Sequence, residues 1–131
     1  MGELERLATI SVDCGFKIHS ALGPGLLESV YEVLLADSLA GRGLSVERQK
    51  PIPITFNGRF FDEGFRADLL VEGRLLIELK SCERLVAVHG RQVLTYLRLL
   101  DLPLGLLMNF GGATFKEGVK RIVNGDLTAA T

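Results

Sequence analysis

Two acids and a lysine stand close together in the middle of the sequence. Asp68 belongs to "FRADLLV", and Glu78 and Lys80 belong to "RLLIELKS", which follows a few residues later. Two neighbouring carboxylates repel each other unless a proton or a cation lies between them. Oxygen ligands with room for water suit Mg²⁺ or Mn²⁺. A lysine beside such an ion is placed to orient a water molecule or to stabilise charge on a phosphate.

Strand alternation decides whether these side chains share a face. In the predicted strand 65–70, Asp68 points away from the apolar residues, and in the strand 74–80, Glu78 and Lys80 do the same. Each strand therefore has one apolar face for the core and one face that carries chemistry.

The loop between the two strands decides whether the two polar faces coincide. A two-residue turn would pair Asp68 with Ile77 and turn Glu78 to the opposite side. A three-residue loop (71–73) that ends at Gly73 would pair Asp68 with Leu76 and place Glu78 diagonally on the same face. We predict the odd-length loop, with Gly73 in the left-handed position of a β-bulge.

Simpler explanations exist for each polar group. Lys80 can form an ordinary ion pair with Asp68 or Glu78 on a solvated face, and the hairpin alone leaves the two explanations balanced. Glu28, near the start of a helix, is explained by the helix dipole. His89, Gln92 and Tyr96 follow one flank of another helix, as a satisfied polar edge would. These last residues are spaced i, i+3 and i+7.

The elements that position these residues follow from the apolar pattern. Helical spacing predicts a helix over about residues 4–21, a second from after "GPG" to about residue 40, and a third over 86–101. Period-two segments and turn signals, among them Asn57-Gly58, predict strands. The predicted strands are 44–49, its continuation 52–56, 59–61, 65–70, 74–80, 104–110 and a short segment around 119–123.

Composition limits the class of protein. The chain has 131 residues, 47% of them apolar, and a formal net charge of −1, so no overall basic field indicates nucleic-acid binding and little repulsion opposes self-association. Cys14 and Cys82 have no metal-ligand spacing and are expected to be reduced thiols. The N-terminus does not read as a signal peptide, and no apolar run has the length of a membrane span. We expect one domain over 1–131, in the cytoplasm and without a membrane partner.

Four segments resemble the hallmark segments of the GxxExxY family, which is grouped with the PD-(D/E)XK nuclease superfamily. They are "GPGLLESVYE", "FRADLLVEGRLLIELKS", "HGRQVLTYLRLL" and "GLLMNFG", and the likeness covers roughly residues 16–125. The resemblance implies a restriction-endonuclease-like α/β (α+β) fold with an αβββαβ core, a mixed central sheet flanked by helices. The order of elements read from the apolar pattern agrees with it. Ala67 stands where the superfamily motif has proline.

The resemblance also implies roles for individual residues. Asp68 and Glu78 would be metal ligands, the Leu79 backbone carbonyl a further one, and Glu28 a helical acid that supports the metal. Lys80 would be the catalytic lysine, and Gln92 and Tyr96 would line the site.

The function that follows is a Mg²⁺-dependent (or Mn²⁺-dependent) nuclease that acts on nucleic acid, with DNA expected before RNA. Arg66, Tyr96 and Arg84 are the expected substrate contacts, and an ion pair with Glu78 is the alternative role for Arg66. Because the net charge disfavours strong unaided binding, the chain is expected to form a homo-oligomer, first of all a dimer, or to work as a module delivered by a partner. The alternatives are a catalytically silent module for binding or assembly and an enzyme acting on a small phosphorylated metabolite. Further candidate phosphate contacts are Arg91, Arg98, Lys116, Lys120 and Arg121.

Overall fold

A mixed five-stranded sheet runs through the structure, a computed structural model that describes residues 2–62 and 64–125. The strand order is β1-β4-β5-β6-β7, in which β5 and β6 pair in parallel and the other neighbours are antiparallel. The strands are β1 (Val46–Pro51), β4 (Arg66–Val71), β5 (Leu75–Lys80), β6 (Leu104–Asn109) and β7 (Val119–Val123).

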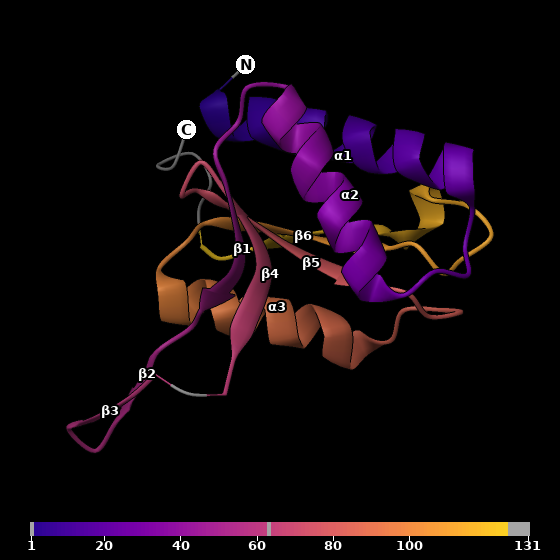
Figure 1. Ribbon diagram of the computed structural model, residues 1–131. Helices are drawn as coiled ribbons and strands as arrows, with labels where there is room; N and C mark the ends of the chain where they lie inside the picture. Colours follow the sequence, from indigo (N-terminus) through magenta and orange to yellow (C-terminus); the bar gives the residue numbers. More distant parts are fainter. Residues whose placement is uncertain (1, 63, 126–131) are drawn as a thin grey trace.

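Helices cover both faces of this sheet (Figure 1). Helices α1 (Glu3–Leu22) and α2 (Glu28–Gly41) lie on one face, and α3 (Ala87–Leu100) lies on the other. Because β5 is sandwiched between the two layers, its alternate residues enter two different cores. The first core contains Leu75, Ile77 and Leu79 from β5, whereas the second contains Leu76. A short 3₁₀ helix, η1 (Lys116–Gly118), precedes β7.

A separate two-stranded hairpin, β2 (Ile54–Phe56) and β3 (Arg59–Phe61), projects from the body of the protein (Figure 1). The predicted Asn57-Gly58 turn is confirmed, and both residues have positive φ. The prediction that 52–56 continues the first strand is wrong. The Ile52 N–H still donates to the Phe65 carbonyl at 3.0 Å. Pro53 has no N–H for the ladder, however, and the chain leaves the main sheet there.

The predicted fold class and order of elements are confirmed, including the short strand at 119–123. Both cysteines are free thiols, as expected. Within residues 2–62 and 64–125, no helix combines the length and the apolar character that crossing a bilayer requires.

Candidate active site

The β4–β5 hairpin has the odd-length loop that the sequence predicts. The loop contains three residues, 72–74, and Gly73 is left-handed with φ 65°. It begins one residue later than predicted, so the expected pairing of Asp68 with Leu76 is wrong. Continuing the observed register places Asp68 directly opposite Glu78 instead of diagonally.

Hydrogen bonds around the loop explain the one-residue difference. The Arg74 N–H donates to the Val71 carbonyl at 3.0 Å, closing a turn in which Glu72 is left-handed as well as Gly73. Glu72 is held there by Ser45 at the edge of β1. The Glu72 N–H donates to the Ser45 carbonyl at 2.8 Å, and the Ser45 N–H donates to the Glu72 carboxylate at 2.5 Å. A long-range contact therefore sets the register.

The two carboxylates of the hairpin are each bound by the backbone of the opposite strand. The Asp68 N–H donates to Glu78 Oε1 at 2.8 Å, and the Leu79 N–H donates to Asp68 Oδ2 at 2.8 Å. These bonds keep both acids on one face of the sheet. The oxygens that these backbone groups do not bind are Glu78 Oε2 and Asp68 Oδ1. Asp68 Oδ1 is approached by Gln49 Nε2 at 3.4 Å.

Glu78 is a buried acid, and no ion pair in the described part of the chain offsets the cost of burying its charge. The residue is only 4% exposed. Burial first and the neighbouring Asp68 carboxylate second raise the pKa of Glu78 to about 8, against the opposing effects of the Asp68 N–H and the Lys80 charge. Such a pair favours a shared proton or a bound cation. Within residues 2–62 and 64–125, no three His, Cys, Asp or Glu side chains converge in a metal-binding group, so the acids form a pair.

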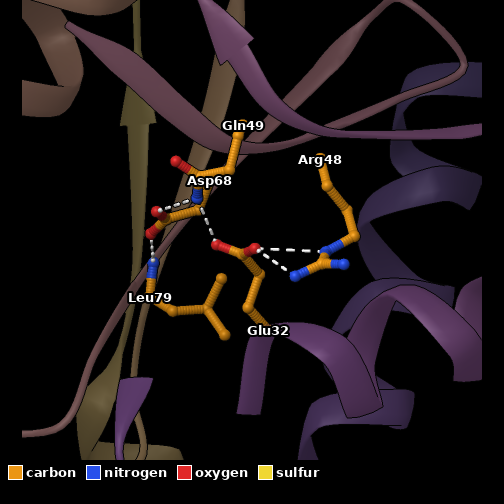
Figure 2. A network of polar contacts seen from close by, with 5 residues as sticks. All are labelled: Glu32, Arg48, Gln49, Asp68 and Leu79. Atoms are coloured by element: carbon orange, nitrogen blue, oxygen red, sulfur yellow. Dashed lines mark hydrogen bonds and ion pairs between the residues drawn. The ribbon is translucent and has the colours of Figure 1, made fainter. Parts of the chain in front are cut away.

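A third acid reaches this pair from α2 through an amide (Figure 2). Glu32 is 5% exposed and accepts from Gln49 Nε2 at 2.6 Å and from Arg48 at 3.1 Å. Gln49 Nε2 also approaches Asp68 Oδ1 at 3.4 Å. Burial raises the pKa of Glu32, although its bonds with Gln49 and Arg48 act in the opposite direction.

Gln49 takes an unusual backbone conformation to make this bridge. It lies inside strand β1 and yet has φ 54°, a left-handed conformation that is strained for glutamine. The conformation is held by bonds from Gln49 to Glu32 of α2 and to Asp68 and Arg66 of β4. The side chain thereby links the α2 acid Glu32 to Asp68.

Lys80 belongs to a second polar chain on α3. Its ammonium donates to Gln92 Oε1 at 3.5 Å, and Gln92 Nε2 donates to the Tyr96 hydroxyl at 3.0 Å. In the described part of the chain, no ion pair joins Lys80 to Asp68 or Glu78. The simpler explanation, a direct ion pair, is therefore not what the structure shows. Burial, followed by the Glu78 charge, raises the pKa of Tyr96.

Glu28 is the predicted site residue that these contacts do not include. It is the first residue of α2 and is exposed, and no described contact joins it to the hairpin acids. Glu32, one turn later, is the α2 acid that the structure buries toward Asp68. The sequence did contain a signal, because an acid four residues after Glu28 shares its helix face. Gln49 had no such signal, because a left-handed strand residue is set by tertiary contacts.

The remaining predicted contacts lie at the surface. Arg66 is exposed and donates to the Gln49 carbonyl at 3.4 Å, and no ion pair with Glu78 is found in the described residues. Arg84 follows β5 beside a hollow of about 560 Å³. His89 Nδ1 accepts from the Val86 N–H at 3.1 Å, so its ring caps the start of α3, as the polar-edge explanation expects.

The other five predicted phosphate contacts are also exposed. Arg121 is already engaged, because it forms an ion pair with Glu5 at 2.7 Å. The full set is Arg91, Arg98, Lys116, Lys120 and Arg121.

Tyr31, three residues after Glu28 in the segment "GPGLLESVYE", has a structural role. Its hydroxyl donates to the Gly23 carbonyl at 2.5 Å and accepts from the Leu26 N–H at 3.3 Å. Its ring stacks on Phe110 at 4.5 Å between centroids. Ser81, just after β5, donates to the Leu26 carbonyl at 2.7 Å. The loop between α1 and α2 is therefore fastened to the end of the strand that carries Lys80.

Comparisons with known proteins agree with this architecture. Comparison with curated proteins gives no match. Among solved structures, the crystal structure of SSO0001 is similar, with a TM-score of 0.54 and 20% identity, over 98% of this chain and 61% of that chain. The chain thus spans about three fifths of that structure, and the likeness shows the fold. The family model of the PD-(D/E)XK nuclease superfamily matches residues 5–122. Because the match covers nearly the whole chain, this protein belongs to the PD-(D/E)XK nuclease superfamily.

Proposed function

We propose that the chain is a metal-dependent nuclease of the GxxExxY family, which hydrolyses phosphodiester bonds in nucleic acid. The observation that carries the proposal is the pairing of Asp68 with Glu78. Each carboxylate is bound through one oxygen by the opposite strand, and Glu78 is buried without an ion-pair partner in the described part of the chain. A hairpin that served only stability would gain nothing from this arrangement.

The donor set fits Mg²⁺ or Mn²⁺. Magnesium is commonly bound by one or two carboxylates, with water completing the coordination. Asp68 Oδ1 and Glu78 Oε2 are the oxygens that would hold the ion, and the Leu79 carbonyl is a further proposed ligand. A divalent cation bound there supplies positive charge to a phosphate and lowers the pKa of its bound water.

Lys80 is the proposed catalytic group. Its ammonium is free of the carboxylates and is steadied by Gln92, which is itself held by Tyr96. A lysine so placed donates a hydrogen bond to an attacking water or to a phosphate oxygen, and so stabilises charge as the bond to phosphorus forms. Glu28 remains a proposed support for the metal, and Glu32 with Gln49 keeps Asp68 in place.

The substrate and the assembly are further parts of the proposal. Superfamily membership supports nucleic acid as the substrate, with DNA before RNA. Arg66, Arg84 and Tyr96 are the proposed substrate contacts. A homodimer is proposed because the net charge of −1 offers few phosphate contacts per chain and little repulsion between copies.

A cleavage assay tests this function. Purified protein is incubated with single- and double-stranded DNA and RNA in Mn²⁺, beside Lys80→Ala and Asp68→Asn. Cleavage by the wild type that both variants lose supports the proposal. Cleavage that survives in both variants would show that the activity belongs to a contaminant or to another site.

One observation favours a second function, a catalytically silent module for binding or assembly. The described acids converge as a pair, and the third acid, Glu32, is already neutralised by Arg48 at 3.1 Å. Calorimetry separates the two functions. Binding of Mn²⁺ that Glu78→Ala abolishes supports the nuclease, whereas no binding, or equal binding by both proteins, supports the silent module.

A further inference from the structure

The β2–β3 hairpin exposes large aromatic side chains. Phe56 is 64% exposed, Phe60 66% and Phe61 42%. Exposing several large apolar rings on a small projecting element costs solubility, and such patches usually mark a binding surface.

The register of the hairpin sorts these rings onto two faces. Ile54 pairs with Phe61, and Phe56 pairs with Arg59, so these four residues share one face, here named the Phe56 face. The guanidinium of Arg59 lies over the Phe61 ring, 5.6 Å from its centroid. Phe60 lies on the opposite face. The Phe56 face therefore combines two aromatic rings with a cation that lies over one of them.

Contacts connect the base of the hairpin to the candidate active site. Phe65, which follows the hairpin, packs against Tyr96 with 6.0 Å between ring centroids. Tyr96 is bound by Gln92, and Gln92 by Lys80. Arg66, the next residue, is exposed at the start of β4. These contacts link the base of the hairpin to the residues that hold Lys80.

We propose that the Phe56 face binds unpaired bases of a single-stranded nucleic acid and guides that strand toward Lys80. This inference rests on the proposed function. Aromatic rings stack on bases of any sequence, and an arginine among them adds attraction for bases and phosphates. Duplex bases already stack on one another and offer no free faces, so single strands are the matching substrate class. A purely apolar protein partner would leave Arg59 buried without a partner.

Binding measurements on hairpin variants test the inference. Fluorescein-labelled 15-mers of one mixed sequence, as single-stranded DNA, single-stranded RNA and duplex DNA, are titrated with the full chain in EDTA, and anisotropy is followed. The variants are Phe56→Leu/Phe61→Leu, which keeps apolar strand residues but removes the rings, and Phe60→Leu, its matched control on the other face. Sedimentation velocity reports the oligomeric state of each protein.

The expected result is selective. Because stacking on an aromatic ring is worth about 1–3 kcal/mol per base, the double variant should bind single strands about tenfold or more weakly. The single-strand affinity of Phe60→Leu should stay within about twofold of the wild type. The affinity of the double variant for duplex DNA should equal that of the wild type. Arg59→Gln should lower the salt slope of single-strand binding by about 0.7. The DNA and RNA arms show which strand is preferred.

Three results would overturn the inference. They are absence of single-strand binding by the wild type, equal binding by the double variant, and loss of binding together with a shift from dimer to monomer. The last result would assign the hairpin to contact between copies of this chain. None of them touches the cleavage assay, so duplex cleavage lost in Lys80→Ala would leave the proposed function standing.

Discussion

Replacing Glu78 by glutamine should remove much of the pH dependence of stability in the metal-free protein. Burial and the Asp68 charge raise the pKa of Glu78 from 4.5 to about 8, so the folded chain holds this proton more tightly than the unfolded chain. The stabilising contribution is fully present below about pH 4.5. It is lost as the pH rises toward 8, because the carboxylate must then be charged in a buried site.

The size of the effect follows from the two pKa values. Each pKa unit corresponds to about 1.4 kcal/mol, so moving from 4.5 to about 8 costs the folded protein on the order of 5 kcal/mol between pH 4 and pH 9. That is a large part of the roughly 5–15 kcal/mol by which domains are stable. Asp68→Asn should reduce the loss only in part, because burial, the larger cause, remains.

Urea unfolding followed by circular dichroism between pH 5 and pH 9 in EDTA measures this; the chain has no tryptophan for a fluorescence signal. Because burial also raises the pKa of Glu32, the informative quantity is the difference between Glu78→Gln and wild type. The free energy of unfolding of Glu78→Gln should exceed that of the wild type by an amount that grows as the pH rises. Asp37→Asn, at an exposed position of α2, is the control and should follow the wild type. If the free energies of unfolding of Glu78→Gln and wild type change in parallel with pH, the assignment of a buried carboxyl with a raised pKa at position 78 is refuted.

Three other substitutions should give distinct results. Lys80→Gln should lower the cleavage rate by about 10²–10³-fold and leave the Mn²⁺ affinity measured by calorimetry within about twofold of the wild type. An unchanged cleavage rate would show that Lys80 has no part in the mechanism. Gln49→Gly should relieve the strain of a left-handed backbone but remove the side chain that contacts Asp68. We expect Mn²⁺ binding about 10–100-fold weaker, with little change in the urea midpoint. An Mn²⁺ affinity equal to that of the wild type would show that Gln49 does not position Asp68. Tyr31→Phe should lower the free energy of unfolding by about 1–3 kcal/mol, because it removes a hydroxyl that makes two hydrogen bonds. A smaller loss would show that ring stacking alone holds the loop between α1 and α2.

Local periodicity explains why so much of the fold was predictable. Helical and two-residue periods are written within each segment, so the order of helices and strands could be read without knowing how they pack. The side of β5 that carries Glu78 and Lys80 follows from alternation alone. The odd-length loop at Gly73 was also predictable, because glycine is the residue that tolerates left-handed backbone.

The tertiary structure decided which residues of different segments meet. The loop begins one residue later than predicted, which moves the pairing by two residues, because Ser45, far away in sequence, holds Glu72 in a left-handed turn. The buried α2 acid is Glu32 and not Glu28, since the docking of a helix on a sheet selects which of its turns is covered. The role of Gln49 could not be predicted, because its left-handed backbone is held by contacts with α2 and β4. A sequence specifies which side chains share a strand or a helix face, whereas long-range packing specifies which of them meet.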